Sequence, residues 1–205
     1  MPQKSEFDRV LQRVGGGKEP VDYGIMDGDS TVLLVKSGNG GSYCGYEDKY
    51  LRLADRVNRK YGYTVICASN PIHGDKKPES DMCQVKDYAN LRGFDRYHVL
   101  YMGFSDGARI GACHGADHPE ICRMALLNCP LMINWHKTKA GILRFSGERA
   151  TFVFGSLDPS CRYAELIRTL ESKNPRIRLE IVAGQDHHFS KDECDLAGLA
   201  EKYLL

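Results

Sequence analysis

Six short apolar runs, separated by segments of helical period, constrain the fold of this 205-residue chain more than any other feature. The runs occupy residues 31–36, 64–68, 97–102, 123–128, 151–155 and 178–182. Most are continuously apolar rather than alternating, which is typical of strands that are covered on both faces. Between them, apolar residues such as Tyr50, Leu53, Ala54 and Val57 recur at helical spacing. This alternation predicts an α/β fold, with a mostly parallel central sheet and helices on both of its faces.

The N-terminal segment has a different pattern. Phe7, Val10, Leu11 and Val14 are spaced as on one face of a helix, and Ser5 is a candidate cap for it. A run of three glycines follows and is expected to end this helix. We therefore predict an N-terminal helix and a glycine-rich linker over residues 1–20.

A single α/β domain is predicted for residues 21–205, since no internal repeat or low-complexity segment divides them. Residues 21–26 run through Asp27-Gly28 into the strand that starts at Thr31, and this pattern predicts a hairpin at the entry to the sheet.

Composition excludes several classes of function. The net charge is +1, and no basic stripe indicates a nucleic acid or an anionic membrane as partner. The sequence as given has no apolar leader and no run of about 18 apolar residues. We expect a cytoplasmic protein, and the sequence leaves its oligomeric state open.

Eight cysteines are distributed along the chain without any C-x-x-C pair. Several fall in predicted core elements, so we interpret them as reduced thiols of a cytosolic protein. Their spacing does not favour a zinc site, and no group of side chains indicates another metal or an organic cofactor.

A Gly-x-Ser-x-Gly pentapeptide, Gly103-Phe104-Ser105-Asp106-Gly107, directly follows the apolar run at 97–102. A strand that turns through this pattern into a helix is typical of the nucleophile elbow of serine hydrolases, where the glycines permit a tight and strained turn. Ser105 is therefore a candidate nucleophile. The small residues that follow it let the next helix pack closely, so that its positive N-terminal end points at Ser105.

A serine nucleophile needs a base, a carboxylate that orients the base, and donors for the oxyanion. Asp158 follows the strand at 151–155 and is the candidate acid, although a helix N-cap is an alternative role for it. His187 and His188 follow the last strand, and position alone leaves either of them open as the base. The candidates appear in the order Ser, Asp, His, which is the order of one triad fold only.

The candidate oxyanion turn is Ser37-Gly38-Asn39-Gly40-Gly41, which follows the first core strand. Glycines there can direct backbone N–H groups toward a site at the carboxyl ends of the strands. The second donor is expected from the backbone of Asp106. We further expect Gly38, Gly40 and His188 to contact the substrate.

Together these motifs resemble those of the α/β-hydrolase superfamily over about residues 21–205. The turn at 37–41 stands in the place of the family's H-G-x-G-G turn, with Ser37 in place of the usual histidine. The segment Gly184-Gln185-Asp186-His187 resembles the family's G-x-D-H-x-F ending and selects His187 as base. The resemblance implies Ser105, His187 and Asp158 as a catalytic triad, with the N–H groups of Asn39 and Asp106 as oxyanion donors.

A lid domain, common in relatives of this family, has little room here. Only residues 130–150 separate Cys129 from the strand at 151, which allows a loop or one short helix carrying Trp135 and Phe145. The chain therefore resembles small carboxylesterases, thioesterases and dienelactone-hydrolase-like enzymes. Dienelactone hydrolases use cysteine at the elbow, so their own activity is not implied.

These observations favour a serine hydrolase that cleaves a small-molecule ester or thioester through an acyl-enzyme, without a metal or cofactor. A serine peptidase or amidase of the same fold is an alternative, because a fold does not determine the substrate. A non-catalytic binding protein is a third hypothesis. Labelling by an active-site serine probe separates the enzymes from the binding protein, and parallel ester and amide assays separate the two enzymes.

Overall fold

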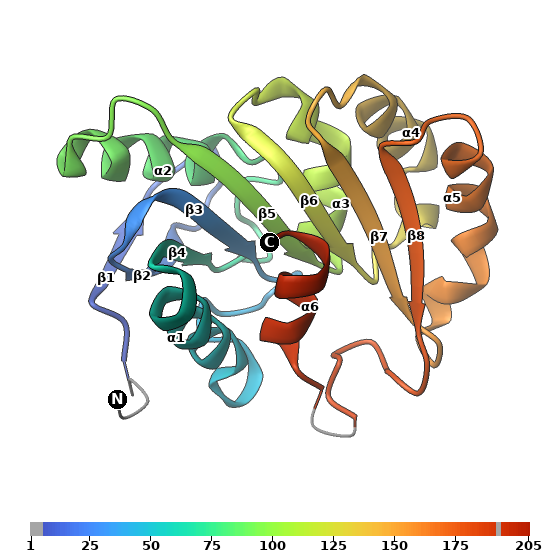
Figure 1. Ribbon diagram of the computed structural model, residues 1–205, viewed down its shortest axis with the longest axis horizontal. Helices are drawn as coiled ribbons and strands as arrows, with labels where there is room; N and C mark the ends of the chain where they lie inside the picture. Colours follow the sequence, from blue (N-terminus) through green and yellow to red (C-terminus); the bar gives the residue numbers. More distant parts are fainter. Residues whose placement is uncertain (1–5, 192–193) are drawn as a thin grey trace.

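A mostly parallel eight-stranded sheet forms the centre of the computed structural model, which describes residues 6–191 and 194–205 (Figure 1). The strands are β1 (Arg9–Arg13), β2 (Val21–Met26), β3 (Asp29–Lys36), β4 (Tyr63–Ala68), β5 (His98–Phe104), β6 (Ile121–Leu127), β7 (Arg149–Gly155) and β8 (Ile177–Val182). Their order across the sheet is β1-β2-β4-β3-β5-β6-β7-β8. β1 and β2 pair antiparallel, and all the later strands run parallel to one another.

Strands β3 to β8 confirm the six predicted apolar runs. On β3, Val32 and Leu34 join the apolar cluster on one face of the sheet, while Leu33 and Val35 join the cluster on the other face. Because successive side chains of a strand point to opposite faces, a strand covered on both sides is apolar at every position.

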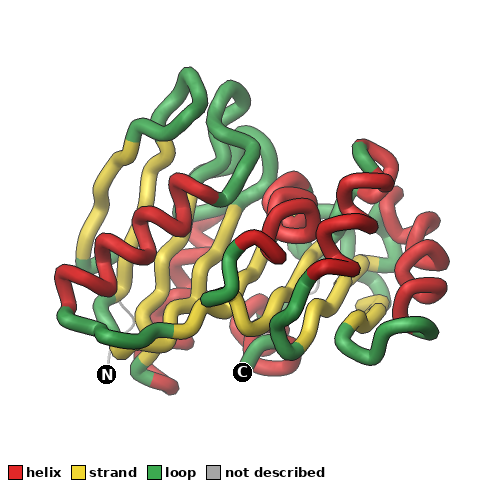
Figure 2. The backbone as a smooth tube through the Cα atoms, turned by 90° about the horizontal axis from the view of Figure 1, so that it is seen from above, coloured by secondary structure: helices red, strands yellow, loops and turns green. Residues whose placement is uncertain are grey.

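Helices cover both faces of the sheet, as Figure 2 shows from above. They are α1 (Lys49–Tyr61), α2 (Glu79–Arg92), α3 (Asp106–His114), α4 (Trp135–Arg144), α5 (Ala164–Glu171) and α6 (Leu196–Tyr203), with short 3-10 turns η1 (Tyr46–Asp48), η2 (Gly115–Asp117), η3 (Leu131–Ile133) and η4 (Pro159–Tyr163). Buried residues of α1 and α6 share one cluster, and those of α2 to α5 share the other. None of the helices in the described segments is long and apolar enough to span a membrane.

The predicted N-terminal helix is wrong, because residues 9–13 form strand β1 at the edge of the sheet. The spacing that predicted a helix would have buried four apolar side chains on one face. In the structure Val10 and Val14 are 58% and 80% exposed, while Phe7 packs its ring over Gly24. In β1 the backbone N–H and C=O groups form hydrogen bonds with β2. A short, exposed helix would have only its own internal hydrogen bonds, which are too few to make it stable. Ser5, the predicted cap, lies outside the described residues.

The predicted hairpin between β2 and β3 is also wrong, because β2 pairs with β4 and β3 lies on the far side of β4. A two-residue hairpin turn needs positive φ at Asp27, Gly28 or both, and neither residue has it. Instead the connection crosses the start of β4, where the side-chain amide of Asn58 donates to the carbonyls of Asp27 and Tyr63 at 2.9 and 2.8 Å.

The segment where a lid could be inserted contains only η3 and α4. Helix α4 packs directly on α3, so closely that a Cβ atom on Gly141 would come within 2.3 Å of the Ala112 carbonyl oxygen. Of the two expected alternatives, a loop or one short helix, the structure has a short helix, and this helix belongs to the layer that covers the sheet.

Candidate active site

Ser105 lies at the sharp turn between β5 and α3 and has a positive φ, with φ 51° and ψ −115°. A non-glycine residue held at positive φ is strained and often marks a functional site. The flanking glycines permit the turn: a Cβ atom on Gly103 would lie 2.7 Å from the backbone nitrogen of Ala108, and one on Gly107 would lie 2.4 Å from the carbonyl oxygen of Lys36. Helix α3 can therefore start directly behind the serine and close to the end of β3.

His187, in the loop after β8, connects Ser105 with Asp158. Its Nε2 lies 3.1 Å from Ser105 Oγ, and its Nδ1 is hydrogen-bonded to Asp158 Oδ2. Since an ionised carboxylate only accepts, Nδ1 carries the proton and the Nε2 lone pair faces the serine hydroxyl. The structure thus brings together the three side chains that the sequence predicts, and it places His187 rather than His188 against the serine.

Asp158 combines the two roles that its position suggests. Its side chain is 1% exposed, and Oδ1 caps η4 by accepting hydrogen bonds from the backbone N–H and hydroxyl of Ser160. The other oxygen faces His187. The cap therefore fixes the carboxylate that orients the imidazole.

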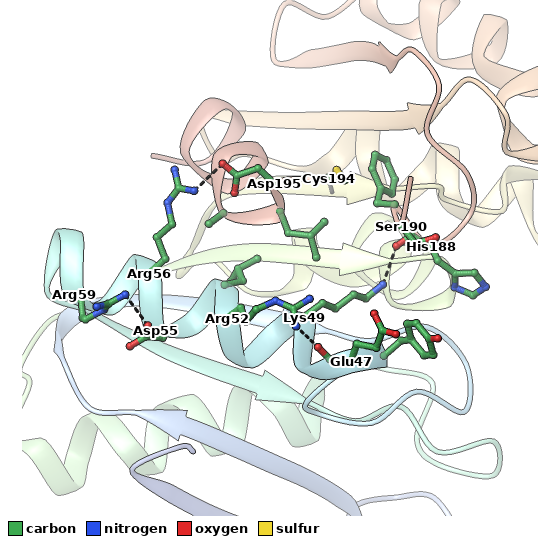
Figure 3. A pocket seen from close by; sticks show the side chains of 15 residues that line it. Glu47, Lys49, Arg52, Asp55, Arg56, Arg59, His188, Ser190, Cys194 and Asp195 are labelled. Atoms are coloured by element: carbon green, nitrogen blue, oxygen red, sulfur yellow. Dashed lines mark hydrogen bonds and ion pairs between the residues drawn. The ribbon is translucent and has the colours of Figure 1, made fainter. Parts of the chain in front are cut away.

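His188 faces a different part of the surface. Its ring packs edge-on against the His187 ring with centroids 5.3 Å apart, and its carbonyl accepts from Lys49 Nζ at 2.9 Å. It lines one end of a cavity of about 660 Å³ between α1 and the segment that leads into α6 (Figure 3). Ser105 does not line this cavity. The structure thus does not place the His188 side chain against Ser105.

The turn after β3 lies directly beside Ser105. A Cβ atom on Gly38 would be 3.3 Å from Ser105 Cβ, and Gly40 has φ 72°. Ser37, which stands where the family usually has histidine, donates its hydroxyl to the Gly41 carbonyl at 2.9 Å and closes the turn. The Gly40 N–H is used by Asn70. In the described part of the chain, neither the N–H group of Asn39 nor that of Asp106 donates to a backbone acceptor.

The Asp106 side chain is fixed by hydrogen bonds from two neighbouring side chains. Arg109 donates to its Oδ1 at 2.7 Å, and Asn70 Nδ2 lies 3.2 Å from its Oδ2. Burial opposes the charged form, but Arg109, Asn70 and the nearby Lys76 together keep the pKa of the Asp106 carboxyl below its ordinary value. Asp106 is therefore a fixed anion behind its own N–H group.

Sequence reasoning missed Asn128, which contacts both the loop that carries His187 and the end of β7 that leads to Asp158. It ends the predicted strand at 123–128 and has φ 48°, a conformation that asparagine tolerates well. Its side-chain amide donates to the carbonyls of Asp186 and His187 at 3.0 and 2.9 Å and accepts from the Gly155 N–H at 2.8 Å. The signal in the sequence was an asparagine at the carboxyl end of an apolar run.

No family model matches this sequence. No curated protein sequence matches it either. Solved structures do resemble it over nearly their whole length. An α/β serine hydrolase homologue from Coxiella burnetii superposes with a TM-score of 0.68 at 14% identity, covering 97% of this chain and 98% of its own.

Two further solved structures match as completely. A serine hydrolase without a lid from Xanthomonas campestris has a TM-score of 0.63 and 19% identity, covering 100% of this chain and 98% of its own. A dienelactone hydrolase from Anabaena variabilis has a TM-score of 0.64 and 15% identity, covering 96% and 98%. At such low identity the likeness concerns the backbone arrangement, and by that measure the chain has the α/β-hydrolase fold in its lidless form.

Proposed function

We propose that this protein is a serine hydrolase that cleaves a small ester or thioester through an acyl-enzyme. The observation that carries the proposal is the hydrogen-bonded series from Asp158 through His187 to Ser105, with the serine on a strained strand-to-helix turn. Three side chains from separate loops in this arrangement are recognised by geometry rather than by sequence position.

The reaction follows from the proton positions. Ser105 Oγ attacks the substrate carbonyl carbon while His187 Nε2 takes the hydroxyl proton. His187 then passes this proton to the leaving alcohol or thiol as the carbonyl–leaving-group bond breaks. Asp158 stabilises the imidazolium and holds its orientation. In the second half a water molecule attacks the acyl carbon while His187 takes its proton. The bond from this carbon to Ser105 Oγ then breaks, His187 returns the proton to the serine oxygen, and the acid leaves. These steps need no metal or organic cofactor.

The N–H groups of Asn39 and Asp106 are the proposed oxyanion donors. Both are free of backbone acceptors in the described residues, and the turn that carries Asn39 lies against Ser105. A donor of this kind contributes on the order of 10²–10³ in rate. Gly38 and Gly40 of the same turn are proposed to contact the substrate.

The absence of a lid supports a small substrate that reaches an open site. The names of two structural neighbours, a serine hydrolase without a lid and an esterase from Pyrococcus furiosus, agree with a hydrolase of esters. The serine at position 105 distinguishes this chain from elbows that use cysteine.

Labelling with a fluorophosphonate probe, followed by mapping of the modified residue, tests the proposal most directly. We expect modification of Ser105 and turnover of short-chain aryl esters. Ser105→Ala should lower kcat by a factor on the order of 10⁴ or more, because the three side chains act as a unit. The control is Ser172→Ala, whose hydroxyl donates to the Thr169 carbonyl at the end of α5.

Two results would reject the proposal: full esterase activity in Ser105→Ala, or no labelling of the intact wild-type protein. Assays of matched ester, thioester and amide substrates then determine which bond is cleaved. If Asp158 orients the base, Asp158→Asn should lower kcat by about 10⁴ while the protein stays folded.

A further inference from the structure

A polar network connects the loop after β4 with both proposed oxyanion donors. We propose that Asn70 and Lys76 are positioning residues that hold Asn39 and Asp106 in a fixed relation to each other. This inference rests on the proposed function, since it concerns the groups that would bind the oxyanion.

Asn70 is the centre of the network and is fully buried. Its backbone N–H donates to the Gly41 carbonyl at 2.9 Å, and its own carbonyl accepts from the Gly40 N–H at 2.7 Å. Its side-chain Nδ2 lies 3.2 Å from both the Ser37 carbonyl and Asp106 Oδ2. One residue thus contacts the turn that carries Asn39 and the first residue of α3.

Lys76, whose side chain is partly exposed, also contacts both the turn that carries Asn39 and the Asp106 side chain. Its Nζ donates to Asn39 Oδ1 at 2.8 Å, to Asn70 Oδ1 at 3.0 Å and to the Pro71 carbonyl at 2.8 Å. The Asp106 carboxylate lies 3.5 Å away. An ammonium group has three donors, and all three are used. Lys76 therefore has no donor left for a substrate, which favours a positioning role over a binding role.

The turn needs such support because three of its five residues are glycines, which restrict the backbone least. Oxyanion stabilisation depends on donors that are already in place when charge develops. A displacement of about 1 Å can lower the rate 100-fold. The network fixes the turn to the loop after β4 and to the start of helix α3. The oxyanion would lie between this turn and the start of α3.

Lys76→Met keeps most of the side-chain length and removes the three donors. We expect kcat to fall about 10- to 100-fold with KM changed less than about twofold, because substrate binding does not use this group. Hydrogen exchange of the segment 37–41 should become faster, while the melting temperature stays close to that of the wild type. The control is Lys77→Met, which removes the neighbouring ammonium group and should change none of these quantities.

A reciprocal exchange tests the contact between Asn70 and Asp106. Asn70→Asp removes the donor and places a second carboxylate beside the first, so we expect a loss in kcat larger than that of Lys76→Met. Adding Asp106→Asn restores one donor and one acceptor with their places exchanged. The double variant should recover at least about tenfold over Asn70→Asp, whereas independent lesions would combine to a greater loss.

The possible outcomes separate the two proposals. A wild-type protein without turnover or probe labelling rejects the proposed function, and the positioning role is rejected with it. An active wild type in which Lys76→Met and Asn70→Asp keep kcat rejects the positioning role alone. The positioning role is also contradicted if Asn70→Asp and Asp106→Asn fold and their separate losses in kcat simply add in the double variant. If Asn70→Asp does not fold, the kcat of Lys76→Met and the hydrogen exchange of residues 37–41 in this variant still test the positioning role.

Discussion

At Gly107 the first turn of α3 meets the end of β3 without room for a side chain. A Cβ atom there would lie 2.4 Å from the carbonyl oxygen of Lys36 and 2.6 Å from that of Ser37, both of which are backbone atoms. Gly107→Ala must therefore move the helix, the strand end or the Ser105 turn. We expect the free energy of unfolding to fall by about 2 kcal/mol and kcat to fall with it.

Gly93→Ala is the matched control at the end of α2. Gly93 has φ 69°, and no other atom lies within 4 Å of the place that a Cβ atom would take, so alanine there suffers backbone strain alone. We expect a loss of about 1 kcal/mol and an unchanged kcat. Urea unfolding and steady-state kinetics measure both variants. Equal kcat values for the two would contradict the close approach at Gly107.

Strand β1 is anchored by a single aromatic side chain just before it. Phe7 is 7% exposed, covers Gly24 of β2 and packs against the Tyr43 ring with centroids 5.7 Å apart. We expect Phe7→Ala to lower the free energy of unfolding by about 3 kcal/mol, because a buried ring is lost. Val10→Ala, in the exposed part of the strand, should change it by less than about 0.5 kcal/mol.

Thermal or urea unfolding of the two variants tests this role. Activity at 25 °C should be the same in both, since β1 lies at the edge of the sheet away from β5 and β8. A Val10→Ala loss as large as that of Phe7→Ala would indicate that the strand itself, rather than its anchor, is stabilised by side-chain packing.

Most of the strands that sequence reasoning identified are buried along most of their length, and β8 is the partly exposed exception. Strands covered on both faces have apolar residues at every position, so β3 to β7 are visible without a partner. β1 is exposed on much of its length, and the spacing of Phe7, Val10 and Val14 fitted a helix equally well. Only the hydrogen bonds to β2 decide between these two conformations.

Buried thiols give the whole molecule a predictable dependence on alkaline pH. Cys67 and Cys129 are fully buried, and burial raises the pKa of both thiols far above the ordinary value. In the unfolded chain a thiol loses its proton above about pH 8.5. There the native state binds more protons than the unfolded state, so stability falls as pH rises.

We expect a decrease in the free energy of unfolding from about pH 8.5 to 10, to which Cys67 and Cys129 each contribute a slope that approaches about 1.4 kcal/mol per pH unit at the upper end of this range. Cys67→Ala and Cys129→Ala should each remove one such contribution from the slope. Val99→Ala, a buried truncation without a titratable group, should shift the curve and leave its slope unchanged. Urea unfolding under reducing conditions measures the free energy of unfolding at each pH. If the two cysteine variants have the same slope against pH as the wild type, the expectation is contradicted.

The amino-acid sequence by itself determined the α/β class, six of the strands, the absence of room for a lid, and a serine, an aspartate and a histidine in loops after successive strands. These features depend on local composition, since apolar periodicity and turn residues act within a few positions. The tertiary structure alone decided that the first residues are a strand, that β4 separates β2 from β3, and that His187 rather than His188 meets Ser105. It also decided the contacts of Asn70 and Lys76 with the turn beside the serine. Each of these depends on hydrogen bonds between groups that are distant in the chain, and no local pattern encodes their partners.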